Sequence, residues 1–372
     1  MTIQKPFSER LRRLRREMNR AGCSALLITK PENRRYLSGF TAVDTQLDES
    51  SGRLLITKKN QYLLTDFRYE IQAAKEAKGF TVVIYKAGFV SDLVRLLKQH
   101  RNPTLGFEEV HTTVAAHREL SKSLKGVKLV PLTGLVENLR RIKDDWEVRR
   151  IVRALRITEE ALERTLSFVK SGMAEIEVAR YLEEAMVQLG AEGPAFDSIV
   201  ASGPNAALPH AVPTKRRIKE SETIVFDCGA KYNGYGADMT RTIVLGRPRP
   251  WIKRIYQTVR HAQLAALKSI KPGMTAIKAD SLAREIIEEA GYGDNFGHAL
   301  GHGVGLATHE APSLSRLRDD ELEAGMIVTV EPGIYIEGRG GVRLEEMILL
   351  KNDGNRLLNR NSNFYDFSTT AS

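Results

Sequence analysis

Hydrophobic positions in the first third of the chain alternate between helical and extended spacing. Leu11, Leu14 and Met18 recur at helical spacing among charged residues, which predicts an amphipathic helix over residues 8–20. Helical spacing returns over residues 70–78 and 91–99. Short apolar runs bounded by turn residues predict strands over residues 24–29, 52–57, 61–65 and 80–85. This alternation predicts an α/β domain, with helices layered on a sheet, over residues 1–137.

The remainder, residues 138–372, contains an internal repeat. Three pairs of segments correspond in order: KSGMAEI (170–176) with KPGMTAI (271–277), residues 224–229 with 328–333, and the strand near Asp238 with the strand near Glu345. The first segment of each set opens a predicted helix that ends at a glycine, Gly190 or Gly291. Because order, helix ends and acidic positions all repeat, we expect two α+β halves related by a pseudo-twofold axis and closing around a shared centre.

Each half carries two carboxylates within or beside apolar strands: Asp227, Asp238, Glu331 and Glu345. A buried, unpaired charge costs several kcal/mol, so these groups must be paired, protonated, exposed or bound to metal. Exposure on one face of a sheet would explain any one of them alone. Four of them, placed by the repeat, indicate a metal site. The Asn233-Gly234 pair predicts a hairpin that brings Asp227 and Asp238 side by side.

Histidine supplies the remaining ligand type. Residues 298–310 hold three of the eight histidines, His298, His302 and His309, among glycines that let the backbone approach a ligand closely. Any one of them alone would be interpreted as a hydrogen-bonded loop residue. Four carboxylates with one imidazole and no thiolate favour Mn²⁺, Co²⁺ or Fe²⁺ over a structural Zn²⁺. Four anionic ligands suit two divalent ions, for which we expect Mn²⁺, with Co²⁺, Fe²⁺ or Zn²⁺ as alternatives.

Charge and composition narrow the class of protein. The net charge of +10 arises in residues 1–137, which hold 24 Lys+Arg against 14 Asp+Glu. A basic surface could meet nucleic acid or an anionic membrane, but the arginines lie on the polar side of the predicted first helix. We therefore expect neither partner. Only Cys23 and Cys228 are present, and no apolar run is long enough to span a bilayer, so we expect a cytoplasmic protein.

Several motifs resemble the pita-bread metallopeptidases, and within them the aminopeptidase P and prolidase group. They are FDCGA (226–230), ADMTRT (237–242), HALGHGVGLATHE (298–310), EPGIY (331–335) and VRLEE (342–346). The first domain resembles the creatinase-type N-terminal domain at RYLSGF (35–40) and TDFRY (65–69). The resemblance covers nearly the whole chain. It implies an α/β N-terminal domain followed by an α+β pita-bread catalytic domain.

Two features depart from the commonest pattern of this group. Glu346 stands where many members have aspartate, and residues 41–50 form a longer and more acidic segment than usual. Neither feature touches the expected ligands. The second could alter the entrance for the substrate.

The resemblance also implies roles for individual residues. It implies five metal ligands, matching the set reached from the strands and histidines: Asp227, Asp238, His302, Glu331 and Glu345. By the same resemblance, the residues that line the substrate site are His210, His298, His309 and Tyr335. Glu331 would also shuttle a proton, and His309 or His210 would stabilise the oxyanion or position the carbonyl. Arg343 would orient a ligand carboxylate.

The activity implied by the resemblance is metal-dependent hydrolysis of the Xaa-Pro bond in peptides with proline at the second position. A prolidase restricted to Xaa-Pro dipeptides is the main alternative. A methionine aminopeptidase would not need the large first domain, and a creatinase would lack the metal carboxylates. A catalytically inactive binding module for protein or RNA would typically have lost ligands. The resemblance further implies a homodimer formed through the first domain.

Overall fold

The computed structural model describes residues 6–44, 46, 49–98 and 103–360. The chain divides into two compact units, Met1–Arg140 and Arg141–Ser372. Both this division and the predicted boundary between residues 137 and 138 fall within the short helix α6 (Glu137–Arg141). Each unit has its own sheets and its own core, so each is described by itself.

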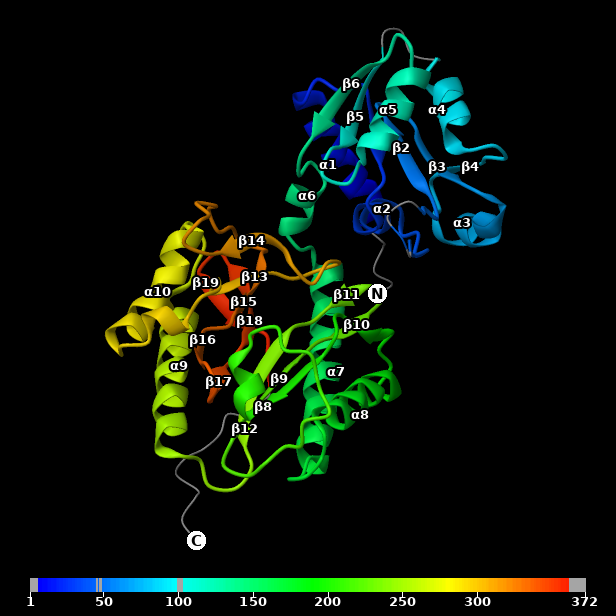
Figure 1. The fold of residues 1–372 in the computed structure, drawn as a ribbon. Helices are drawn as coiled ribbons and strands as arrows, with labels where there is room; N and C mark the ends of the chain where they lie inside the picture. Colours follow the sequence, from blue (N-terminus) through cyan, green and yellow to red (C-terminus); the bar gives the residue numbers. More distant parts are fainter. Residues whose placement is uncertain (1–5, 45, 47–48, 99–102, 361–372) are drawn as a thin grey trace. The chain divides into compact units, whose positions relative to one another are not determined.

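The first unit is built on one mixed sheet with the strand order β4-β3-β2-β1-β5-β6 (Figure 1). Its strands are β1 (Ala25–Ile28), β2 (Arg53–Thr57), β3 (Gln61–Thr65), β4 (Thr81–Ile84), β5 (Thr104–Glu108) and β6 (Lys128–Leu132). Strand β1 pairs antiparallel with β2 but parallel with β5, which in turn pairs parallel with β6. The carboxyl ends of β1, β5 and β6 therefore meet at one edge of the sheet.

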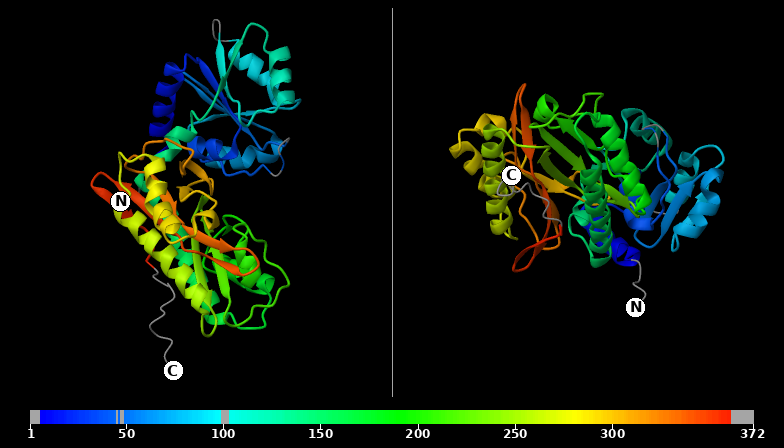
Figure 2. Two further views of the ribbon diagram at one scale, coloured as in Figure 1. Left: turned by 60° about the vertical axis from the view of Figure 1, so that its left-hand side comes forward. Right: turned by 90° about the horizontal axis from the view of Figure 1, so that it is seen from below.

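Helices cover both faces of this sheet (Figure 2). They are α1 (Phe7–Arg20), α2 (Pro31–Ser38), α3 (Glu70–Glu76), α4 (Phe89–Leu97), α5 (Val114–Ser123) and α6, with a 3₁₀ turn η1 (Phe67–Tyr69) before α3. Leu27 and Leu105 pack with buried leucines of α4 and α5. Helix α1 lies against the opposite face and buries Leu11, Leu14 and Met18, as the spacing predicted.

The sequence predicted part of this unit correctly. Strands β1 to β4 and helices α1, α3 and α4 confirm the predicted segments, although the predicted end at residue 99 lies outside the described residues. Helices α2 and α5 and strands β5 and β6 were not predicted. Arg12, Arg16 and Arg20 are exposed on α1, as expected for its polar side, but Arg10 is buried and its NH1 donates to the carbonyl of Tyr36 (2.8 Å).

The second unit places sheets between two pairs of helices (Figures 1 and 2). The helices are α7 (Asp145–Phe168), α8 (Glu175–Gln188), α9 (Pro250–Ser269) and α10 (Ala276–Glu289), with 3₁₀ turns η2 (Gly203–Ala207) and η3 (Gly293–Asn295). The strands up to α9 are β7 (Gly193–Pro194), β8 (Ile199–Ser202), β9 (Thr223–Cys228), β10 (Ala230–Tyr232), β11 (Tyr235–Gly236) and β12 (Met239–Val244). The later strands are β13 (Gly301–Gly303), β14 (Glu310–Leu314), β15 (Ile327–Val330), β16 (Gly333–Ile336), β17 (Gly340–Arg343), β18 (Glu346–Lys351) and β19 (Gly354–Leu357).

The two main sheets of this unit have the orders β12-β9-β8 and β14-β13-β15-β18-β19. Smaller sheets join β11-β10-β7 and β16-β17. Alternate residues of β15 and β18 serve two different cores, because successive side chains of a strand point to opposite faces. Ile327 and Leu349 pack in the core of α7 and α8, whereas Val328 and Ile348 pack in the core of α9 and α10.

The internal repeat is confirmed as two similar halves of the second unit. In the first half, the Gly172 N–H donates to the carbonyl of Ile218 (2.8 Å). In the second, the Gly273 N–H donates to that of Leu322 (2.8 Å). Gly190 (φ 95°) and Gly291 (φ 82°) follow the ends of α8 and α10 in the left-handed conformation that favours glycine.

The predicted hairpin is also confirmed. Strand β10 pairs antiparallel with β11, and the turn places Asn233 and Gly234 at φ 49° and 80°. Positive φ at both central residues matches the turn type that Asn-Gly favours. The hairpin leads directly from β9, which contains Asp227, to the segment that carries Asp238.

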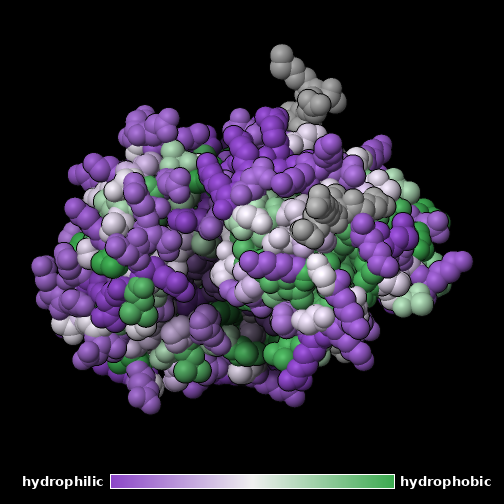
Figure 3. Space-filling model, turned by 90° about the horizontal axis from the view of Figure 1, so that it is seen from above, coloured by the Kyte–Doolittle hydropathy of each residue, from purple (hydrophilic) through white to green (hydrophobic). Residues whose placement is uncertain are grey.

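The surface shown in Figure 3 is predominantly hydrophilic, with hydrophobic side chains scattered in small groups. No helix among the residues described is long and apolar enough to cross a membrane.

Candidate metal centre

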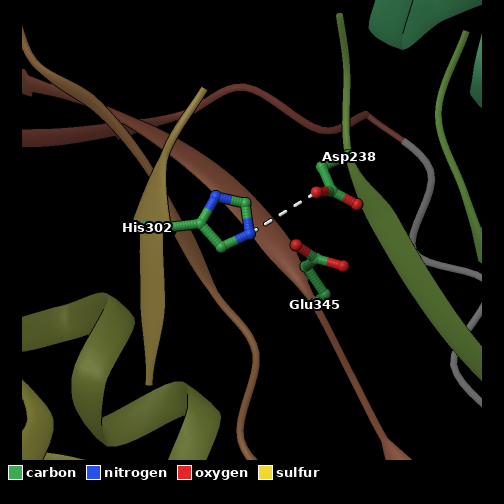
Figure 4. Close-up of side chains that lie close together, drawn as sticks. All are labelled: Asp238, His302 and Glu345. Carbon is green, nitrogen blue, oxygen red and sulfur yellow. Dashed lines mark ion pairs between the residues drawn. The ribbon is translucent and has the colours of Figure 1, made fainter. Parts of the chain in front are cut away.

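Three side chains from separate segments of the second unit converge on one point. Ligand atoms of Asp238, His302 and Glu345 all lie within 4.8 Å of one another (Figure 4). Asp238 precedes β12, His302 lies in β13 and Glu345 precedes β18. The imidazole Nε2 of His302 lies 3.6 Å from Oδ2 of Asp238. The cluster therefore draws on both halves of the repeat.

Glu331 joins this cluster through His302. It follows β15, and its Oε1 lies 3.3 Å from Nε2 of His302. The hydroxyl of Thr329 donates to the same carboxylate oxygen (3.1 Å) and accepts a hydrogen bond from the backbone N–H of His302 (3.0 Å). One threonine thus fixes the spacing between a carboxylate and an imidazole.

Asp227 is held by Arg343. The guanidinium NH2 lies 2.6 Å from Oδ2 of Asp227. Nε of the same arginine donates to the hydroxyl of Thr240 (3.0 Å), and that hydroxyl donates to Oε2 of Glu345 (2.8 Å). Thr240 is also the cross-strand partner of Asp227 in the β9–β12 pair. Arg343 and Thr240 therefore connect Asp227 with Glu345.

Burial and mutual repulsion shift the ionisation of the carboxylates. Burial raises the pKa of Asp238, and the neighbouring Glu345 and Asp227 raise it further. Burial likewise raises the pKa of Glu345, with Glu331 adding to the effect. For Glu331, burial acts in the same direction, but the hydrogen bond with His302, together with the charges of His302, His298 and Arg343, outweighs burial and lowers the pKa to about 2. A cation among these groups would offset the repulsion.

Two buried oxygens support this interpretation. Oδ1 of Asp227 and Oε1 of Glu345 are buried and have no hydrogen-bond partner among the described residues. A buried polar atom without a partner is rare and requires an explanation, such as a bound ion. Carboxylate oxygens with one imidazole nitrogen are suitable donors for divalent metal ions. The donor set therefore fits such ions.

The residues expected to line the substrate site lie at different depths. Nε2 of His298 is 2.9 Å from the hydroxyl of Tyr335, which in turn is 2.9 Å from NH1 of Arg343. The ring of His309 lies beside that of His302, with centroids 4.2 Å apart. Burial lowers the pKa of His309, and the charges of His302 and His210 add to this. His210 itself is exposed in the loop after η2.

Sequence reasoning missed an ion pair that braces the histidine segment. Nζ of Lys143 lies 2.7 Å from Oε1 of Glu310, and the two side chains are only 1% and 8% exposed. Glu310 directly follows His309 and pairs with Gly303 at the irregular step of the β13–β14 ladder beside His302. No short-range pattern could reveal this pair, because its members lie far apart in the chain.

A second missed group holds the other end of the histidine segment. Arg284 and Asp280 form a buried ion pair on α10 (2.6 Å). Arg284 donates to the carbonyl of His298 (2.8 Å), and Asp280 accepts from the N–H of Leu300 (3.0 Å). The signal was present in the sequence, since an acid and a base four residues apart on the apolar face of a helix indicate a buried pair.

Comparisons with known proteins identify the family of both units. Residues 149–352 match the model of the metallopeptidase family M24, and residues 10–142 match that of the creatinase/prolidase N-terminal domain. The chain is 39% identical to a Xaa-Pro dipeptidase from Pyrococcus furiosus, covering 95% of this chain and 98% of that protein.

Solved structures show the same similarity over nearly full length. A Xaa-Pro dipeptidase from Bacillus anthracis superposes with a TM-score of 0.90 at 41% identity, covering 95% of this chain and 98% of that one. An X-Pro aminopeptidase from Thermotoga maritima superposes with a TM-score of 0.84 at 38% identity, covering 92% of this chain and 97% of that one.

Proposed function

The chain belongs to the metallopeptidase family M24, and on this premise we propose that it hydrolyses the bond between an N-terminal residue and a following proline. The observation that carries the proposal is the buried cluster of carboxylates around His302, with oxygens of Asp227 and Glu345 that lack hydrogen-bond partners among the described residues. Similar proteins named Xaa-Pro dipeptidase and X-Pro aminopeptidase support the choice of substrate.

The proposed metal ligands are Asp227, Asp238, His302, Glu331 and Glu345. They would hold two divalent ions, for which we propose Mn²⁺, with Co²⁺, Fe²⁺ or Zn²⁺ as alternatives. When bound, such ions acidify water and polarise a scissile carbonyl. The raised pKa values of Asp238 and Glu345 support this assignment, because a cation would keep both carboxylates ionised.

The remaining residues would bind substrate and move protons. Glu331 takes the proton of the attacking water and passes it towards the leaving proline nitrogen. His309 or His210 stabilises the negative charge that develops on the carbonyl oxygen or positions the carbonyl. His298 and Tyr335 contact the substrate, while Arg343 keeps Asp227 in place. Tyr335 contacts both His298 and Arg343, which supports the proposal that these three residues form one wall of the substrate site.

A prolidase restricted to Xaa-Pro dipeptides is the second candidate. It is favoured by the relatives from Pyrococcus furiosus and Bacillus anthracis, both of which are named Xaa-Pro dipeptidase. The two activities share their chemistry and differ in whether residues beyond proline are accepted. We further propose a cytoplasmic homodimer formed through the first unit, without a nucleic-acid partner.

Peptide hydrolysis by metal-reconstituted protein tests the proposal. Metal-free protein would be supplied with Mn²⁺, Co²⁺ or Zn²⁺ and assayed on matched Xaa-Pro, Xaa-Pro-Yaa and Xaa-Ala-Yaa peptides. We expect metal-dependent cleavage of the proline peptides only. Cleavage of Xaa-Pro but not Xaa-Pro-Yaa would select the prolidase. Failure with every metal, together with retention of RNA, would favour the inactive binding module instead.

A further inference from the structure

A cavity of about 210 Å³ lies within the first unit, separate from the candidate metal centre. It is formed where β1, β5 and β6 end, by residues such as Ile28, Glu108 and Leu132. At this place the strand order changes direction, because β2, β3 and β4 extend from one side of β1 whereas β5 and β6 extend from the other. In open α/β sheets, ligands bind outside the carboxyl ends of strands at such a point.

The inner wall of the cavity is aliphatic. Leu26, Ile28 and Val136 line it and are at most 1% exposed, and Leu132 adds a half-buried side chain at the end of β6. Such a wall favours the apolar body of a ligand, since moving apolar surface out of water is favourable.

Charged groups also line the cavity, and they are held in fixed positions. The amide Nδ2 of Asn33 donates to Oε1 of Glu108 (2.6 Å) and to Oε1 of Glu137 (2.8 Å). NH1 of Arg140 donates to Oδ1 of Asn33 (2.9 Å), which fixes the orientation of that amide. The two carboxylates are therefore held near each other by the protein itself.

Glu108 is the immobile member of this group. Its Oε2 accepts hydrogen bonds from the backbone N–H of Thr29 (2.6 Å) and of Lys30 (2.8 Å). Glu137 is more accessible, because its side chain is 29% exposed and that of Lys30, 3.2 Å away, is 32% exposed. The Lys30 ammonium carries three protons, so it can keep its ion pair with Glu137 and still donate a hydrogen bond to a ligand.

His111 completes the polar side of the cavity. One ring nitrogen, Nδ1, lies 3.2 Å from the hydroxyl of Thr29, so the opposite nitrogen can face a ligand. Lys30 thus offers donors to an anion, while Glu137 beside Glu108 offers acceptors to a cation. Acceptors and donors at the edge of one aliphatic cavity are the complement of a zwitterion with an apolar side chain.

We propose that this cavity binds one free aliphatic amino acid. Its ammonium contacts Glu137, its carboxylate contacts Lys30, and its side chain packs against the aliphatic wall. The volume of about 210 Å³ is many times what one water molecule needs, which leaves room for one amino acid but not for a long peptide. The inference does not depend on the proposed peptidase reaction, because none of these residues belongs to the metal centre.

Methyl-labelled NMR of the full-length, metal-loaded protein tests the proposal at the site itself. The methyl signals of Ile28 and Val136 would be followed while L-leucine is added. They should shift saturably, and 4-methylpentanoate and 3-methylbutylamine, which each lack one charged group, should bind at least ten-fold more weakly. Methyl signals that do not shift, or equal binding of all three compounds, would overturn the proposal.

Variants distinguish this cavity from the active site. Glu137→Gln and Lys30→Gln should each weaken L-leucine binding about ten-fold or more, and Leu132→Trp should block it by filling the cavity. Methyl signals distant from the cavity check that each variant is folded, and the two polar variants keep the test valid if Leu132→Trp disturbs the fold. Glu331→Gln at the metal centre should leave the shifts unchanged. If Glu331→Gln abolishes the methyl shifts, or if Glu137→Gln has no effect on them, the cavity is not the binding site.

Discussion

The two halves of the second unit have the same framework but contribute differently to the metal centre. The first half supplies two aspartates, Asp227 and Asp238, and the second supplies two glutamates and His302. Support also crosses between the halves, because Arg343 from β17 holds Asp227 and Thr240 from β12 holds Glu345. Glu331 and His302, in contrast, are tied together within one half, by Thr329. If these residues are the ligands, duplication has set their positions while their chemistry has diverged.

This difference has a consequence for metal binding. His302 has no counterpart among the proposed ligands of the first half, so the two proposed metal sites are unequal. We expect the site that includes the imidazole to differ in affinity from the other.

Removing a proposed ligand from the first half should have the largest effect. We expect Asp238→Ala to reduce kcat/KM by at least about 10³-fold, more than the roughly 10–100-fold typical of losing a residue that only supports a ligand. The fold should survive, because the change relieves repulsion among buried carboxylates. Kinetics, metal content and circular dichroism would be measured, with the exposed Asp353→Ala as the matched control. Retained turnover would refute the assignment of Asp238.

Breaking the ion pair between Lys143 and Glu310, which braces the histidine segment, should chiefly lower the free energy of unfolding. Lys143→Met removes the counter-charge of a buried carboxylate, and losing one partner of a buried ion pair costs about 3–5 kcal/mol. Urea unfolding followed by tryptophan fluorescence suits this test, because Trp146 and Trp251 lie in α7 and α9, one in each half. Adding Glu310→Gln should recover part of the loss. No recovery would show that the pair contributes by packing alone.

The contribution of the second half to the free energy of unfolding should also depend on pH, through Glu346. The first half has Met239, which does not titrate, at the matching position of the repeat. Burial raises the pKa of Glu346 to about 7 despite its ion pair with Arg241. Its contribution to stability is therefore present below about pH 4.5 and is lost as the pH rises through 7. Relative to Glu346→Gln, the wild type should lose about 3 kcal/mol of unfolding free energy across this range. Parallel pH profiles of metal-free wild type and variant would contradict this.

Removing a contact that links the two halves should weaken metal binding more than removing a contact within one half. Arg343→Gln removes the charge that holds Asp227, and we expect metal affinity to fall about 10–100-fold. Thr329→Val removes one hydroxyl and should cost less, at most about ten-fold. Isothermal titration of metal into metal-free protein would compare them, with exposed Arg356→Gln as the control. The reverse order would mean that the second half dominates metal binding.

How far the sequence predicted these features depends on the range of the interactions. The repeat, the Asn233-Gly234 hairpin and the amphipathic helix α1 follow from local spacing, and all are confirmed. In contrast, α2 was missed although Pro31 stands at its first position, because its short buried sequence has little periodicity. Strands β5 and β6 were missed because Gly106 and Pro131 interrupt their apolar runs.

For the candidate site, the proposed ligands could be predicted from the sequence, but the residues that orient them could not. The carboxylates could be found because a charge in an apolar strand is conspicuous even in one sequence. Thr240, Thr329 and Lys143 are ordinary residue types whose roles arise only when distant strands pair. The structure also distinguishes among the proposed ligands, since Asp238, His302 and Glu345 form the tight group while Asp227 faces Arg343.

The central claim is that the two halves together hold two unequal divalent ions. Anomalous difference maps from crystals grown with Mn²⁺ test it most directly. We expect two peaks among the side chains of Asp227, Asp238, His302, Glu331 and Glu345, with Nε2 of His302 contacting only one of them. A single peak at saturating Mn²⁺, or peaks that His302 does not contact, would contradict the account.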